Sequence, residues 1–265
     1  VGGLDCSLED CIVTWANFVG ISMSGFDNRI LRCEASYCGN SGMGAGVGEN
    51  QLIEDCVVTH NNYWRYSPGW HGGGAKLIPW FNKSTVRNSE FAFNYGPGLW
   101  FDGSCNDSVI EGCYCHDNEG PGIMVEISRG VIVRNNVCVN NRNTLPGIDL
   151  SPLEKKGYAP VNCQATRTEG GSGGNGIFIS SSPHTKAYNN LCYRNESAGI
   201  FAEWARRESG DVSDYGERKS VPVHMSTHDV DVRNNILVNN LSCQLSIRRN
   251  GVDEDTYGNQ SDYNL

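Results

Sequence analysis

GLWFD at residues 98–102 and GIMVE at residues 122–126 are two copies of one short phrase, placed 24 positions apart. In each copy a glycine is followed by side chains that alternate in character, which is typical of a short β-strand. A repeat of this length is typical of a solenoid, whose successive coils stack their strands about 4.7–4.9 Å apart. The two phrases therefore predict adjacent strands in register.

The same pattern recurs along the chain. Glycine opens similar segments at 20–23, 74–77, 176–179 and 199–202. A second phrase follows each strand, and its last position forms one column, made of Cys11, Cys33, Cys56, Ser89, Cys113, Asn136, Asn190 and Asn235. The period is 22–24 residues wherever no insertion intervenes. Leucine-rich repeats share this period, but the chain lacks their leucine consensus and helical segment. We therefore predict an all-β, right-handed parallel β-helix of about eight coils.

The chain is expected to form one domain over residues 1–265, with loop insertions at 61–73, 142–175 and 203–229. Insertions in a solenoid fall in loops, and loops on one face usually build the binding surface. The sequence begins inside a coil, without a signal peptide or a polar cap. We interpret it as the mature part or a fragment of a longer, secreted or periplasmic protein.

The composition of the chain limits the classes of partner that we expect it to bind. The net charge of −9 disfavours nucleic acid and anionic membrane surfaces, and argues weakly against polyanions such as pectate or alginate. No apolar run is long enough to span a membrane. The twelve cysteines fit either disulfides or packed thiols, and we favour packed thiols because their columns also accept Ser, Ala and Val. The oligomeric state is left open.

Asp102 and Glu126 occupy the same position of adjacent repeats, so their carboxyl groups should lie about 5 Å apart. Strand alternation predicts that they point outward with Trp100 and Met124. Retaining glycosidases hold two carboxyls about 5–5.5 Å apart, whereas inverting enzymes need about 6.5–9.5 Å. The pair therefore predicts catalysis by double displacement.

Aromatic and charged residues near this pair suggest a sugar-binding surface, because flat rings stack on pyranose faces and carboxylates bind hydroxyls. The alternative is that the rings merely pack loops onto the solenoid. Glu203 lies in the carboxylate column about 10 Å from Glu126. The candidate substrate-binding residues are Trp64, Trp70, His71, Lys76, Trp80, Trp100 and Glu203.

Two other interpretations of the acidic residues stay open. They can be merely solvated, or Asp102 and Glu126 can hold Ca²⁺ with Asp107 or Asp149. We favour neither, and we expect no metal site and no cofactor.

The segment 98–136, with Gly98-x-Trp100-x-Asp102 and the run VEIS at 125–128, resembles the catalytic segment of β-helix glycoside hydrolases of the β-xylosidase type, glycoside hydrolase family 120. The resemblance implies that Asp102 is the nucleophile and Glu126 the general acid/base.

We therefore predict a retaining glycoside hydrolase that acts on plant or microbial oligosaccharides or polysaccharides. One alternative is a polysaccharide lyase with Lys76 or Arg129 as base, which would release unsaturated products. Another is a non-catalytic glycan-binding or adhesive β-helix, which would bind sugar without turnover.

Overall fold

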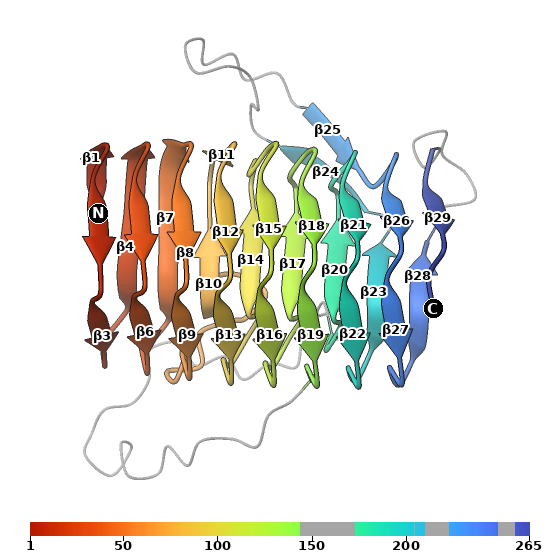
Figure 1. Ribbon diagram of the computed structural model, residues 1–265, viewed down its shortest axis with the longest axis horizontal. Helices are drawn as coiled ribbons and strands as arrows, with labels where there is room; N and C mark the ends of the chain where they lie inside the picture. Colours follow the sequence, from red (N-terminus) through yellow and green to blue (C-terminus); the bar gives the residue numbers. More distant parts are fainter. Residues whose placement is uncertain (144–172, 204, 210–222, 249–257) are drawn as a thin grey trace.

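The computed structural model shows a parallel β-helix whose coils stack along the long axis of the molecule (Figure 1). It describes residues 1–143, 173–203, 205–209, 223–248 and 258–265. Within these ranges the chain forms strands, turns and bends, and no helix. The predicted all-β parallel β-helix is confirmed.

The first sheet carries the phrases that begin with glycine. It contains β11 (Phe81–Asn82), which pairs with β7, and a path of parallel strands in the order β1 (Gly2–Leu4), β4 (Val19–Phe26), β7 (Ser41–Glu49), β10 (Gly73–Leu77), β14 (Leu99–Asp102), β17 (Ile123–Glu126), β20 (Ile177–Ser180), β23 (Ala198–Glu203) and β28 (Cys243–Ile247).

Two further parallel sheets complete each coil. The second, of nine strands, is β2 (Ser7–Glu9), β5 (Arg29–Leu31), β8 (Leu52–Glu54), β12 (Thr85–Arg87), β15 (Val109–Glu111), β18 (Ile132–Arg134), β21 (Lys186–Tyr188), β26 (Asp231–Arg233) and β29 (Gln260–Asp262). The third, of eight, is β3 (Ile12–Thr14), β6 (Glu34–Ser36), β9 (Val57–Thr59), β13 (Glu90–Ala92), β16 (Tyr114–His116), β19 (Val137–Val139), β22 (Leu191–Tyr193) and β27 (Ile236–Val238). Eight three-stranded coils and a partial ninth match the expected number.

The core is a column of apolar side chains inside the three sheets. On the first sheet, Leu99, Phe101, Ile123 and Val125 are fully buried in it. Burial of such a side chain contributes about 1.5–3 kcal/mol. The intervening residues of the same strands point to the opposite face. The outer face of β14 and β17 therefore carries the candidate site.

Amide ladders pin the register of the coils. In the buried ladder that runs through Asn118, the side-chain amide of each Asn donates to the Oδ1 of the next, at 2.9–3.0 Å, in the order Asn94, Asn118, Asn141, Asn195 and Asn240. The predicted column that ends in Asn235 is confirmed, since Asn136 donates to Asn190 and Asn190 to Asn235, each at 3.0 Å.

The cysteines of the described residues are free thiols, which agrees with the packed-thiol interpretation. Cys115, Cys138 and Cys192 stack in register on the third sheet. Burial raises the pKa of Cys105 and of Cys113 to about 12, so both thiols stay protonated at neutral pH.

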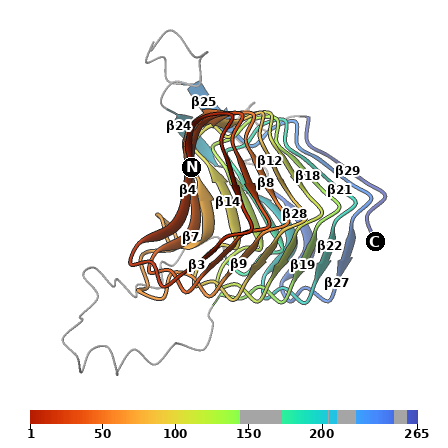
Figure 2. The same ribbon diagram turned by 60° about the vertical axis from the view of Figure 1, so that its left-hand side comes forward.

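The insertions leave the solenoid at its corners. The 61–73 loop joins β9 to β10 and is described in full. Residues 144–172 of the second insertion, and Trp204 and 210–222 of the third, lie outside the described residues. The described part of the third forms the antiparallel hairpin β24 (Arg206–Ser209) and β25 (Val223–Ser226), which projects from the stack (Figure 2).

Candidate active site

The carboxylate pair lies on two adjacent parallel strands of the first sheet. Asp102 at the end of β14 is directly opposite Glu126 at the end of β17, as the repeat predicts. Neighbouring strands are about 4.8 Å apart. The backbone positions of the two residues are therefore one strand spacing apart, and both side chains project from the same face of the sheet.

Lys76 joins this pair from β10, the preceding strand. Its ammonium Nζ lies 2.9 Å from Asp102 Oδ2 and 3.5 Å from the centroid of the Trp100 ring. It also donates a short hydrogen bond to the backbone carbonyl of Trp70. An anion, a π face and a carbonyl oxygen therefore surround this amine.

The outer face is more covered than the sequence indicates. Trp100, Asp102, Met124 and Glu126 were expected to be exposed, but their exposed fractions are 2%, 8%, 5% and 5%. Trp100, Met124 and Phe178 form a small apolar cluster of their own, outside the core. The alternation of side chains along each strand does place these residues on the outer face of the sheet, but large side chains on adjacent coils shield that face from solvent. Charges in such a site interact more strongly than charges in water.

The buried indole of Trp100 offers an unused donor. Its Nε1 has no hydrogen-bond partner among the described residues. Buried tryptophan N–H groups usually find an acceptor.

The 61–73 loop brings Trp70 and His71 towards Lys76. The ring of Trp70 is 76% exposed and its centroid lies 5.9 Å from Lys76 Nζ, so it presents a ring to solvent beside the ion pair. His71 is half-buried, contacts Asn40 through Nδ1 and stacks on Phe18 at 5.5 Å. Burial and the positive charge of Lys76 lower the pKa of His71.

The other two tryptophans take different positions. Trp80 is 36% exposed, and its backbone N–H donates at 3.1 Å to the carbonyl of Gly103, the residue after Asp102. Trp64 packs instead over Gly39, where an added Cβ would lie 2.2 Å from its ring. The ring of Trp64 therefore covers a corner of the solenoid, which is the packing role that the sequence left open, whereas the backbone of Trp80 contacts the residue after Asp102.

Glu203 extends the carboxylate column. The register runs from Glu126 to Ser180 and then to Glu203, which leaves one full strand between the two acids. Ser180 Oγ donates to Glu203 Oε2 at 3.3 Å. Asp107, one of the calcium ligands considered above, lies in the turn after β14. Asp149, the other, lies outside the described residues.

The family model of the right-handed β-helix region matches residues 2–159, which is more than half of the chain. The chain belongs to the right-handed β-helix family. This also agrees with the predicted handedness of the coils.

Solved structures resemble this β-helix in fold. The periplasmic alginate epimerase AlgG matches with a TM-score of 0.61 and 13% identity, over 94% of this chain and 51% of that one. The pectate lyase Pel9A matches with a TM-score of 0.50 and 16% identity, over 93% of this chain and 61% of that one. The chain thus spans about half the length of AlgG. No curated protein matches the sequence.

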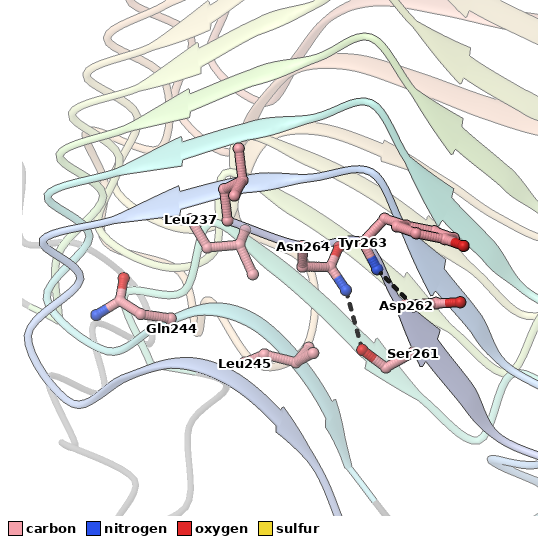
Figure 3. A pocket seen from close by; sticks show the side chains of 8 residues that line it. Leu237, Gln244, Leu245, Ser261, Asp262, Tyr263 and Asn264 are labelled. Atoms are coloured by element: carbon pink, nitrogen blue, oxygen red, sulfur yellow. Dashed lines mark hydrogen bonds between the residues drawn. The ribbon is translucent and has the colours of Figure 1, made fainter.

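Other features of the β-helix lie away from the carboxylates. A hollow lined by Leu237, Gln244, Leu245 and residues 261–265 lies at the last coils (Figure 3), whereas the candidate site on β14 and β17 lies in the middle of the stack (Figure 1). The described residues include no helix suited to crossing a bilayer.

Sequence reasoning missed the apolar cluster around Trp100. Met124, Phe178 and Phe201 stand at the same repeat position as Trp100, on successive strands, and each pairs with the residue of the strand before it. The signal was therefore present in the repeat, two residues after each glycine. What the repeat does not indicate is that these side chains close over one another.

Proposed function

We propose that this chain is a carbohydrate-active enzyme, and that Asp102 and Glu126 perform retaining glycoside hydrolysis. The observation that carries the proposal is the register of β14 and β17, which sets the two acids one strand apart on one face. That spacing suits the carboxyl separation of about 5–5.5 Å in retaining enzymes.

The contacts of Asp102 support its role as nucleophile. The ammonium of Lys76 holds one carboxylate oxygen at 2.9 Å, which would fix the orientation of this carboxylate for attack on an anomeric carbon. Glu126 would then protonate the leaving oxygen and afterwards accept a proton from the hydrolytic water. These assignments agree with the resemblance to glycoside hydrolase family 120.

The surroundings of the pair support a sugar substrate. Trp70 exposes a ring beside Lys76, and the buried indole N–H of Trp100 lacks an acceptor among the described residues. Together they would give a stacking surface and a hydroxyl contact. The net charge of −9 favours a neutral glycan over a polyuronate.

Rescue by azide tests the two roles separately. With aryl xylosides, fucosides and arabinosides as substrates, we expect Asp102→Ala and Glu126→Ala each to lose at least about 10³-fold in kcat. Azide should restore turnover in both variants. The Asp102 variant should yield a glycosyl azide of inverted configuration, and the Glu126 variant one of retained configuration.

Glu111→Gln is the matched control for this test, because Glu111 pairs with Arg134 on the second sheet, away from the site. Its activity should equal that of the wild type. Full activity in either alanine variant, or the opposite stereochemistry of the azides, would contradict the assignment.

A polysaccharide lyase or epimerase is the second candidate, and the position of Lys76 beside a carboxylate favours it. The titles of the similar structures name an alginate epimerase and a pectate lyase. Nζ of Lys76 already contacts three partners, however, and at least one of them would have to be displaced before the amine could take a proton from a substrate. Ultraviolet-absorbing products from alginate or pectate, abolished by Lys76→Ala, would establish a lyase instead.

A further inference from the structure

A second group of side chains with metal-binding chemistry lies at the corner between the first and second sheets. His184 lies in the turn from β20 to β21, and His228 and Asp229 lie in the turn from β25 to β26. Because β21 and β26 are paired neighbours, the two turns stack. The backbone N–H of His184 donates to the carbonyl of His228 at 3.0 Å.

Three ligand atoms converge at this corner. Asp229 Oδ2 lies 2.8 Å from Nδ1 of His228 and 3.7 Å from Nδ1 of His184. All three residues offer a ligand atom within 4.8 Å of the others. Zinc bound at about 2.0–2.2 Å by nitrogen and oxygen in tetrahedral geometry would separate its ligands by about 3.3–3.5 Å. The two separations from Asp229 Oδ2, 2.8 Å and 3.7 Å, lie on either side of this range.

We propose that His184, His228 and Asp229 bind a divalent first-row transition metal ion, with zinc as the best match. Two imidazoles and one carboxylate suit zinc, whereas calcium prefers an all-oxygen shell. Among the described residues this is the group of His, Cys, Asp and Glu side chains that is close enough to share an ion. The fourth position would be left for water or another ligand.

The backbone arranges these ligands before any ion arrives. His184 and Asp229 occupy the same corner position of successive coils, both in the left-handed conformation, with φ of 60° and 51°. Gly258 is the next residue in this column, and a Cβ there would lie 1.7 Å from Asp229 Oδ1. A glycine at 258 therefore leaves room for the carboxylate.

Two cations oppose the ion. Arg129 and Lys186 lie close enough to His184 to help lower its pKa, although burial and the His228 ring contribute more. Their positive charge weakens the attraction for a divalent cation. The three converging ligands must outweigh this repulsion.

A metal ion here would have a structural consequence. The described part of the third insertion returns through β25, two residues before His228. An ion shared with His184 would tie the end of this insertion to the preceding coil. Glu203, at the start of the same insertion, belongs to the carboxylate column.

Zinc titration of the full chain without an affinity tag tests the proposal. We expect isothermal titration calorimetry to give one strong zinc site and no strong calcium site, and zinc to raise the Tm. His184→Asn and Asp229→Asn should each weaken zinc binding at least about tenfold. Asparagine tolerates the left-handed conformation, so both variants should fold.

Asp27→Asn is the matched control, since Asp27 occupies the same corner with φ of 58° in a distant coil. It should bind zinc as the wild type does. Zinc affinity that is equal in all variants would overturn the proposal, as would anomalous zinc scattering from a zinc-soaked crystal that lies elsewhere, for example at the part-exposed thiols of Cys6 and Cys11.

Discussion

At the scale of single residues, the candidate site depends on the charge balance between Lys76 and Asp102. The two side chains are only 6% and 11% exposed, so neither charge is well solvated. A buried ion pair adds little net stability, but removing one partner leaves the other uncompensated. Loss of either side chain should therefore affect both the stability of the protein and the chemistry of the site.

We expect Lys76→Met to lower the free energy of unfolding by about 3–5 kcal/mol, because it strands the carboxylate of Asp102 in a covered site. Adding Asp102→Asn should recover much of this loss. Urea unfolding of both single variants and the double variant measures the coupling. Strictly additive losses would show that the two residues do not act as a pair.

At the scale of elements, the strands are too short to specify their own register, and the ladders of buried amides supply it. Asn118 is the middle of one ladder. It accepts from the backbone N–H and the side chain of Asn94, and donates to Phe91 O and Asn141 Oδ1. Shifting one coil by a residue would leave all four bonds unmade.

Asn118→Ala should therefore cost several kcal/mol, since each buried group left without a partner costs about 1–3 kcal/mol. Thermal unfolding followed by circular dichroism measures the loss. Asn239→Gly serves as control, because Asn239 is exposed and left-handed, with φ of 55°, which glycine tolerates. Equal losses of stability in the two variants would show that the amide ladder does not fix the register.

At the scale of the whole molecule, the thiol-rich core makes stability depend on pH. Burial raises the pKa of Cys56 from 9.0 to about 11, and those of Cys105 and Cys113 from 9.0 to about 12. The folded state therefore keeps protons that the unfolded state releases above pH 9. This stabilising effect is complete below pH 9 and is lost as the pH rises towards 11–12.

Raising the pH from 8 to 10 should lower the free energy of unfolding by about 1.4 kcal/mol for each of these thiols. Cys113→Ser should remove one such contribution, because serine does not titrate in this pH range. The variant should still fold, since Ser89 already occupies the same column in the preceding coil. Urea unfolding at the two pH values measures the difference. An identical pH dependence in wild type and variant would contradict the assignment of Cys113.

The sequence by itself determined the repeat, the parallel β-helix, the register of Asp102 with Glu126 and the amide column. These follow from a period of 22–24 residues, because each coil must place equivalent side chains above one another. Only the tertiary structure decided how covered the outer face is, how Lys76 pairs with Asp102 and where the loop tryptophans lie. It also joined His184 to His228 and Asp229. Those contacts depend on side chains from different coils and insertions closing over one another, which the order of residues within one repeat does not encode.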